Sequence, residues 1–205
     1  MYQRILKNEL RQRFFQGKVI ILTGARQTGK TTLVMELLGD WKESQIRMFN
    51  CDNPTDREVL RNKDQEFLQR LIGSASLILI DEAQKVENIG NTLKLLVDFY
   101  GKEKQIIATG SSSLNLLDQT QEPLTGRKYV YTLFPLSLQE IYSPNDYLKL
   151  RKELEILLVF GMYPEVVSQP SFEEKKELLG ELSSSSIYKD ILEMQEVKGS
   201  DVLVR

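Results

Sequence analysis

The chain of 205 residues has 27 lysines and arginines, 29 aspartates and glutamates, and a formal net charge of -2. This length suits one α/β domain with a small appendage, and the near balance of charge excludes a general basic field for nucleic acid or anionic lipid. The chain contains one cysteine, Cys51, and no histidine. Internal disulfides, histidine-based catalysis and histidine metal ligands are therefore excluded, and the thiol is expected to be a small core residue.

The start of the chain and its hydrophobic pattern bear on its location. Met1-Tyr2-Gln3-Arg4 leads into a charged segment, unlike a signal peptide, and no apolar stretch approaches the length of a membrane span. A lone cysteine fits a reducing compartment. We therefore expect a cytoplasmic protein with no membrane partner.

The first elements are a helix, a strand and a second helix. Residues 1–17 predict an amphipathic helix, with Ile5 and Phe14 among the apolar residues at roughly helical spacing. The β-branched run at 18–22 predicts a buried parallel strand, and a further helix is expected to end at Gly39.

The loop between that strand and helix has the phosphate-binding pattern G-x-x-x-x-G-K-[ST], in the stretch Gly24-Ala25-Arg26-Gln27-Thr28-Gly29-Lys30-Thr31-Thr32. Lys30 is expected to place a positive charge between the β- and γ-phosphates of a nucleotide. The Thr31 hydroxyl is expected to ligate Mg²⁺. For Arg26 two interpretations stay open: an ion pair with an acid beneath the loop, or a contact with phosphate.

Next along the chain, residues 45–50 predict a second strand, and residues 55–72 predict helix with a break near Asn62. Asn62-Lys63-Asp64-Gln65 superficially resembles the N-K-x-D sequence that reads guanine in GTPases. Gln65 stands at the aspartate position, however, and no strand precedes the segment. We therefore predict that ATP and ADP bind in preference to GTP.

The continuous apolar run at 77–80 predicts a strand buried on both faces, and Asp81-Glu82 follows it, with a helix expected next. Ligands bind at the carboxyl ends of parallel strands. Asp81 is therefore expected to hold Mg²⁺ through its water shell, and Glu82 to orient and deprotonate the attacking water. The alternative is the ordinary preference of acids for a helix N-terminus. The position of the pair, about fifty residues after the phosphate-binding loop, favours the catalytic interpretation.

Residues 105–109 predict a fourth strand that ends in Gly110-Ser111-Ser112-Ser113. The hydroxyls of Ser111 and Ser112 lie where they would contact water or the γ-phosphate from the side, as nucleotide sensors. The alternative is that these serines cap the segment that follows.

Arg127 lies between a polar loop and a fifth strand at 128–133. It is a candidate arginine finger, acting in its own chain or in a neighbouring chain's site. A solvated arginine or a structural ion pair is the alternative.

From Pro135 the chain is predicted to be helical, with segments at 146–160 and 171–196 separated by Gly161-Met162-Tyr163-Pro164. Ser137 with Glu140, and Ser171 with Glu174, have capping-box spacing. The expected organisation is an N-terminal helix at 1–17, a core at 18–142 and a helical lid at 143–205. The last residues look like the start of a helix, so we expect a fragment of a longer protein.

Together these motifs resemble the AAA+-like, signal-transducing P-loop ATPases of bacteria and archaea, in particular a subgroup with an N-terminal ATPase domain and an uncharacterised C-terminal domain. The resemblance implies an α/β fold of three αβα layers, a parallel five-stranded sheet of order 5-1-4-3-2, a small helical lid and a missing C-terminal domain. Residues 138–205 lack an obvious sensor arginine of the standard lid. The matching motifs are Leu22–Thr32, Leu79–Gln84, Thr109–Ser113, Gly126-Arg127, Leu133–Ser137 with Glu140, Gly161–Glu165 and Tyr188–Ile191.

Three functions are consistent with these residues. The first is an ATPase that hydrolyses ATP with Mg²⁺ to drive or reset a conformational switch. The second is a nucleotide-dependent interaction module with little turnover, and the third is phosphotransfer to a small molecule, which does not suit Glu82. The expected partners are ATP or ADP with a protein or a second copy of the chain, and nucleic acid only through the missing C-terminal domain.

Overall fold

A computed structural model describes residues 2–111, 116, 120 and 122–184. The chain divides into two compact units. The first comprises residues 3–25 and 29–134, and the second takes the chain from Pro135 onward together with Tyr2 and Arg26–Thr28. Among the described helices, none combines the length and apolar character needed to cross a bilayer.

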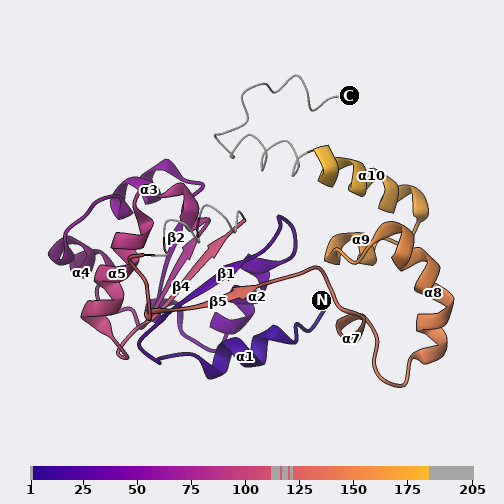
Figure 1. The fold of residues 1–205 in the computed structure, drawn as a ribbon, viewed down its shortest axis with the longest axis horizontal. Coiled ribbons are helices and arrows are strands. Elements are labelled where there is room, and N and C mark those ends of the chain that lie inside the picture. Colours follow the sequence, from indigo (N-terminus) through magenta and orange to yellow (C-terminus); the bar gives the residue numbers. More distant parts are fainter. Residues whose placement is uncertain (1, 112–115, 117–119, 121, 185–205) are drawn as a thin grey trace. The chain divides into compact units, whose positions relative to one another are not determined.

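Five parallel strands form the centre of the first unit (Figure 1). Their order is β2-β3-β4-β1-β5, which read from the other edge is the expected 5-1-4-3-2. The predicted fold class is therefore confirmed. Because every pair is parallel, all five carboxyl ends lie at one edge of the sheet. The strands are β1 Val19–Thr23, β2 Ile46–Asn50, β3 Leu77–Asp81, β4 Gln105–Gly110 and β5 Lys128–Thr132.

Alternation along the strands divides the core into two clusters, one on each face of the sheet. Ile21, Ile78 and Ile80 belong to the cluster formed with the helices α3 Pro54–Leu60, α4 Gln65–Ile72 and α5 Ile89–Tyr100. Ile20, Leu22 and Leu79 belong to the cluster formed with α1 Leu6–Gln12 and α2 Lys30–Leu38. Successive side chains of a strand point to opposite faces, so strands buried on both sides produce three layers.

The predicted break near Asn62 is confirmed, since α3 ends at Leu60 and α4 begins at Gln65. Asn62 itself has a left-handed backbone, with φ of 48°. Asp64 begins the second helix as its cap, because its Oδ1 accepts a hydrogen bond from the backbone N–H of Phe67 at 2.8 Å.

One predicted helix differs from the structure and another is confirmed. The N-terminal helix spans only Leu6–Gln12, instead of 1–17, because the chain turns at Phe15, whose φ is 57° and whose N–H donates to Gln105 Oε1 at 2.7 Å. This tertiary contact overrides the local helical pattern. The helix predicted after Asp81-Glu82 is α5 Ile89–Tyr100, and a short 3₁₀ turn, η2 Ala83–Lys85, lies between Glu82 and this helix.

The second unit contains four described helices: α7 Leu138–Ile141, α8 Tyr147–Phe160, α9 Pro164–Ser168 and α10 Phe172–Leu182. The N–H of Leu136 donates to the carbonyl of Met162 at 2.8 Å, which joins two of the sequence motifs. The capping box predicted for Ser171 and Glu174 is present at the start of α10. The predicted helical residues 185–196, and those from 200 to 205, lie outside the described part of the chain.

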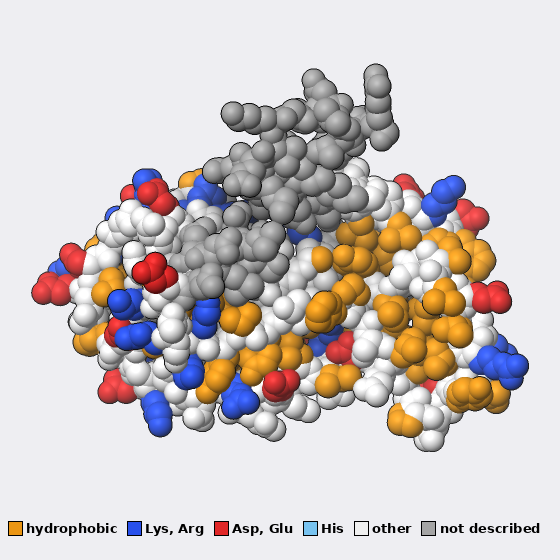
Figure 2. All heavy atoms as spheres, in the orientation of Figure 1, with side chains coloured by type: hydrophobic (Ala, Val, Ile, Leu, Met, Phe, Trp, Pro, Cys, Tyr) orange, Lys and Arg blue, Asp and Glu red, His pale blue; other side chains and the backbone are white. Residues whose placement is uncertain are grey.

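This helical unit contains a partly open pocket of about 200 Å³, and a buried lysine belongs to its lining. The ammonium of Lys175 donates to the carbonyls of Val166 and Val167 at 2.7 and 3.3 Å. Tyr142 donates to Glu153 at 2.6 Å on the same lining. Hydrophobic side chains also gather on the surface of these helices (Figure 2). The exposed large ones are Leu138, Tyr147, Leu148, Leu154, Leu158, Val159 and Phe172.

Candidate nucleotide site

The loop after β1 is shaped by close backbone contacts. Gly24 has φ of 150°, and a Cβ at this position would lie 2.3 Å from the carbonyl oxygen of Leu133, so only glycine fits. Gly29 has φ of 92° and is the N-cap residue of α2. The loop therefore delivers its last residues into a helix N-terminus, the arrangement that favours bound phosphate.

Lys30 lies inside the loop, with only 6% of its surface exposed. Its Nζ donates to the carbonyls of Gly24 and Ala25, both at 2.9 Å. These bonds satisfy a buried ammonium that would otherwise be costly. The lysine is thus held at the centre of the loop, where a polyphosphate would meet its charge.

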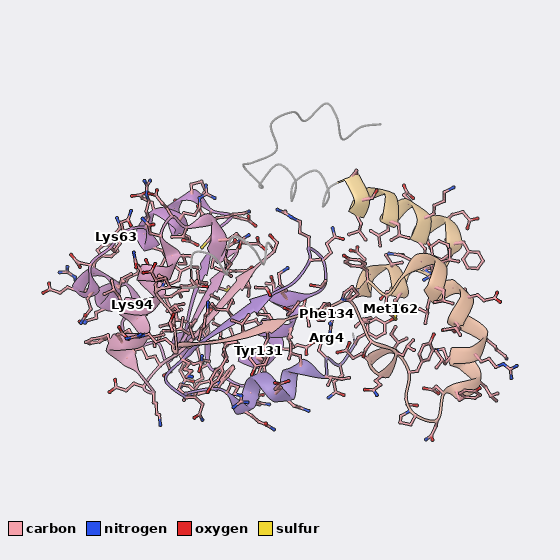
Figure 3. All side chains as sticks on the ribbon, viewed as in Figure 1. Arg4, Lys63, Lys94, Tyr131, Phe134 and Met162 are labelled. Atoms are coloured by element: carbon pink, nitrogen blue, oxygen red, sulfur yellow. The ribbon has the colours of Figure 1, made fainter. Side chains whose placement is uncertain are left out.

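A buried arginine that the sequence reasoning missed braces the same region. Arg4 Nη2 donates to the carbonyl of Phe134 at 2.5 Å, and the two residues lie beside each other in Figure 3. A Cβ at Gly29 would lie 4.0 Å from Arg4 Nη1. An arginine before the first helix has no motif around it, so only the folded chain reveals that it lies next to the loop.

Thr31 and Asp81, the two predicted metal ligands, are in direct contact. The Thr31 hydroxyl donates to Asp81 Oδ1 and Oδ2 at 3.2 and 3.1 Å. Thr109 at the end of β4 also donates to Asp81 Oδ1. Asp81 and Thr109 are neighbours because β3 and β4 pair in parallel, with Ile80 opposite Ala108. A hydroxyl and a carboxylate are hard oxygen donors, so these residues fit Mg²⁺.

Glu82 has a left-handed backbone, with φ of 54° and ψ of 42°, immediately after β3. Its N–H donates to Thr109 Oγ1 at 3.1 Å. Its Oε2 accepts hydrogen bonds from Gln84 Nε2 at 2.7 Å and from Ser111 Oγ at 3.1 Å. The structure thus brings the predicted base and the predicted sensor Ser111 together. It adds Gln84, whose role the sequence did not indicate although the residue was part of a matching motif.

The remaining loop residues differ in exposure. Ala25, Gln27 and Thr32 are exposed, Arg26 is half-buried, and Thr28 is fully buried. Gln27 has a left-handed backbone, with φ of 60°. Ser112, the second predicted sensor, lies outside the described residues.

The structure does not bring Arg127 to this site. Its carbonyl accepts a hydrogen bond from Val19, the first residue of β1, whereas the loop follows the last residue of that strand. At about 3.3 Å per residue, the five residues of β1 separate its two ends by about 16 Å. Arg127 Nε instead donates to Asp98 Oδ1 at 2.5 Å. In this arrangement Arg127 forms the ion pair that was the alternative interpretation, and its role as an arginine finger stays a prediction.

Cys51 follows β2 and is fully buried, as expected. Burial, with a smaller contribution from the nearby carboxylate of Asp56, raises the pKa of the thiol to about 12. The thiol therefore stays protonated at neutral pH, which excludes it as a nucleophile.

The fold and the loop together define a P-loop NTPase. The family model of the AAA domain matches residues 16–142, and the chain belongs to that family of AAA+-like P-loop ATPases. The resemblance seen in the sequence is thereby confirmed, and membership implies nucleotide binding.

The curated relatives are longer proteins. An uncharacterized protein of Mycobacterium tuberculosis is 34% identical over 134 residues, which are 65% of this chain and 29% of that protein. An uncharacterized protein of Methanocaldococcus jannaschii is 22% identical over 95% of this chain and 46% of its own length. The replication factor C small subunit of Sulfurisphaera tokodaii is 24% identical over 66% of this chain and 43% of its own. The chain thus spans less than half the length of these relatives.

Among solved structures, the chain is similar to the Walker-type ATPase of Pyrococcus abyssi, with a TM-score of 0.60. The match covers 95% of this chain and 76% of that one, at 15% sequence identity. At this identity the likeness shows the fold alone.

Proposed function

We propose that this domain binds ATP with Mg²⁺ and hydrolyses it, and that turnover drives or resets a conformational change. The observation that carries the proposal is the junction of loop and sheet, where the Thr31 hydroxyl bonds the carboxylate of Asp81. The next residue is a second carboxylate, Glu82. A protein that only binds a nucleotide needs the first carboxylate for the cation but has no use for the second.

Each residue has a part in this reaction. The loop N–H groups and the Lys30 ammonium bind the phosphates, and Thr31 with Asp81 would hold Mg²⁺. When bound, the cation supplies positive charge to the β- and γ-phosphates. Glu82 accepts a proton from the attacking water, so it contributes only as the water attacks.

The proposed preference for ATP follows from the role of residues 62–65 in the fold. Asp64 caps α4, with its Oδ1 bound to the N–H of Phe67, and Gln65 is the first residue of that helix. Residues 62–65 therefore connect the end of α3 to the start of α4. They offer no aspartate that could recognise guanine. A competition titration in which GTP binds as tightly as ATP would contradict this preference.

Release of phosphate from Mg-ATP tests the proposal. Lys30→Ala should lose nucleotide binding, whereas Glu82→Gln should bind ATP normally and lose turnover. If Glu82→Gln turned over ATP at the unmodified steady-state rate, Glu82 would not be the general base. Adding candidate hydroxyl acceptors and following their phosphorylation separates hydrolysis from phosphotransfer.

A nucleotide-dependent interaction module with little turnover is the second candidate. It is favoured by one observation: the Glu82 carboxylate already accepts two hydrogen bonds, from Gln84 and Ser111. Exposed apolar side chains on α8, such as Leu158 at 77% exposed, offer a surface for a protein partner or a second copy of the chain. A single-turnover experiment decides: ATP bound for hours without cleavage means the module, and cleavage within seconds means the ATPase.

The curated relatives bear on the partner only indirectly. Replication factor C is so named for replication, but this chain spans less than half of such proteins. We propose that the part of the protein described here does not itself bind nucleic acid. The formal charge of -2 on this chain agrees with that assignment.

A further inference from the structure

The hydrogen bonds around Glu82 converge on one of its two oxygens. Gln84 Nε2 donates to Oε2 at 2.7 Å, and Ser111 Oγ donates to the same atom at 3.1 Å. Gln84 Nε2 also lies 3.0 Å from Ser111 Oγ, which closes a triangle of three side chains. Among the described residues, no hydrogen bond to Oε1 accompanies these two. One oxygen is therefore anchored and the other is left to meet a water molecule.

The triangle joins two strand ends. Glu82 and Gln84 follow β3, whereas Ser111 follows β4 directly after Gly110. A Cβ at Gly110 would lie 2.8 Å from Gln84 Oε1, so the glutamine amide packs against the bare backbone of the neighbouring strand. This close packing and the burial of Gln84 restrict the rotamer of its side chain, and its hydrogen bond to Ser111 is buried.

The backbone of Glu82 is also fixed from the other strand. Its left-handed conformation is uncommon for a residue with a side chain, and the N–H bond to Thr109 Oγ1 holds it. With the backbone fixed, the torsion angles of the side chain decide where the carboxylate lies. A glutamate has three such torsions, and anchoring one oxygen removes most of that freedom.

We propose that Gln84 is a positioning residue for Glu82: it holds Oε2 so that Oε1 is presented to the attacking water. The role rests on the proposed ATPase function and acts through the glutamate, without a contact to nucleotide. It follows that Gln84 affects the rate of the chemical step and leaves nucleotide binding alone.

Gln84→Met tests the role, because methionine has nearly the same size and removes the amide. The expected result is a fall in kcat of roughly tenfold with KM for Mg-ATP unchanged within about twofold, as for a lost transition-state contact. Nucleotide affinity, measured with a fluorescent ATP analogue, should also stay the same. Gln65→Met, at the exposed start of α4, is the matched control and should behave as the unmodified protein.

The double variant separates positioning from a structural role. In the Glu82→Gln background, adding Gln84→Met should cause no further loss, because the residue through which Gln84 acts is already disabled. A further loss there, or a parallel change in KM and affinity, assigns a structural role and overturns the proposal. An unchanged kcat for Gln84→Met overturns it as well. If the methionine variant unfolds early, Gln84→Asn withdraws the amide by one methylene and is judged by the same outcomes.

The two proposals fail separately. Normal turnover by Glu82→Gln removes the base itself and with it the proposed mechanism. If Glu82→Gln is inactive and Gln84→Met is fully active, the proposed mechanism stands and only the positioning role of Gln84 is excluded.

Discussion

The hydroxyl of Thr31 donates to both carboxylate oxygens of Asp81, at 3.2 and 3.1 Å, and so connects the start of α2 with the end of β3. Thr109 supports the same carboxylate from β4. The two residues expected to hold Mg²⁺ are therefore held together by three elements. Such preorganisation lowers the entropic cost of forming the site.

Thr31→Val should weaken the effect of Mg²⁺ on nucleotide binding. Valine keeps the size and β-branching of threonine but cannot donate to Asp81 or ligate a cation. We expect the gain in ATP affinity on adding Mg²⁺ to fall by about tenfold or more, as for the loss of a hydrogen bond to a charged group. Titration of ATP with Mg²⁺ and with EDTA measures it, and Thr31→Ser, which keeps the hydroxyl, should restore the gain. An undiminished gain in Thr31→Val would mean that the hydroxyl is not a ligand.

Gly24→Ala should destabilise the core by about 2 kcal/mol or more, since the new methyl group would meet backbone instead of a movable side chain. Its Cβ would lie 2.3 Å from the carbonyl oxygen of Leu133. Gly101→Ala is the control, because Gly101 also has positive φ, at 51°, yet no atom lies within 4 Å of its Cβ. That variant should lose only the cost of backbone strain, about 1–3 kcal/mol at φ 51° and ψ -119°, and Gly24→Ala should lose more. Urea unfolding compares the two, and equal losses would show that the Leu133 contact relaxes.

Much of this site could be predicted because its residues follow strands. Asp81 ends one strand, Ser111 follows another, and Lys30 and Thr31 start the helix after the loop that follows β1; parallel pairing brings these strand ends together. Hydrophobic periodicity and loop composition indicate in a single sequence where strands end and loops begin.

The remaining features depend on contacts between distant residues. The ion pair of Arg127 joins it to Asp98, 29 residues away. Gln84 is held in place by Gly110 and Ser111, and Ser111 is 27 residues away in the chain. Arg4 lies 130 residues from the carbonyl that it bonds. Local patterns contain no signal for such pairs.

Cys51 should resist thiol reagents in the folded protein. Its pKa of about 12 leaves on the order of one thiol in ten thousand ionised at pH 8, against about one in ten for the ordinary value of 9.0. Reaction with Ellman's reagent should therefore be slow and follow unfolding, and it should be immediate in guanidinium chloride. Because this is the only cysteine, the signal has one source. Rapid reaction of the native protein would mean that β2 opens locally.

The same thiol makes stability depend on pH in the alkaline range. Above pH 9 the unfolded chain releases the thiol proton, whereas the folded chain keeps it up to about pH 12. The contribution of Cys51 to stability is thus complete below pH 9 and declines as the pH rises toward 12. Comparing urea midpoints of the unmodified protein and Cys51→Ala at pH 8 and pH 10.5 measures this contribution. The difference between the two proteins should shrink at the higher pH.

Arg127→Ala should leave hydrolysis per chain within about twofold of the unmodified rate, because the residue lies far from the phosphate-binding loop. The protein should also stay folded, because an exposed ion pair contributes only about 0–1 kcal/mol to stability. Arg127 Nε donates to Asp98, and the two side chains are 41% and 43% exposed. Asp98→Ala is the matched control, since it breaks the same pair and leaves the arginine in place. Both variants should lose the same small amount of stability and no activity.

Activity measured over a range of protein concentrations tests whether Arg127 instead serves a neighbouring chain. An arginine finger supplied in trans is worth on the order of 10³–10⁵ in rate. In that case hydrolysis per chain would rise steeply with concentration in the unmodified protein and in Asp98→Ala, but not in Arg127→Ala. Mixing Arg127→Ala with Lys30→Ala chains would then restore activity, because each supplies what the other lacks. We expect neither effect: the rate per chain should stay flat with concentration, and the mixture should show only the activity of its Arg127→Ala chains.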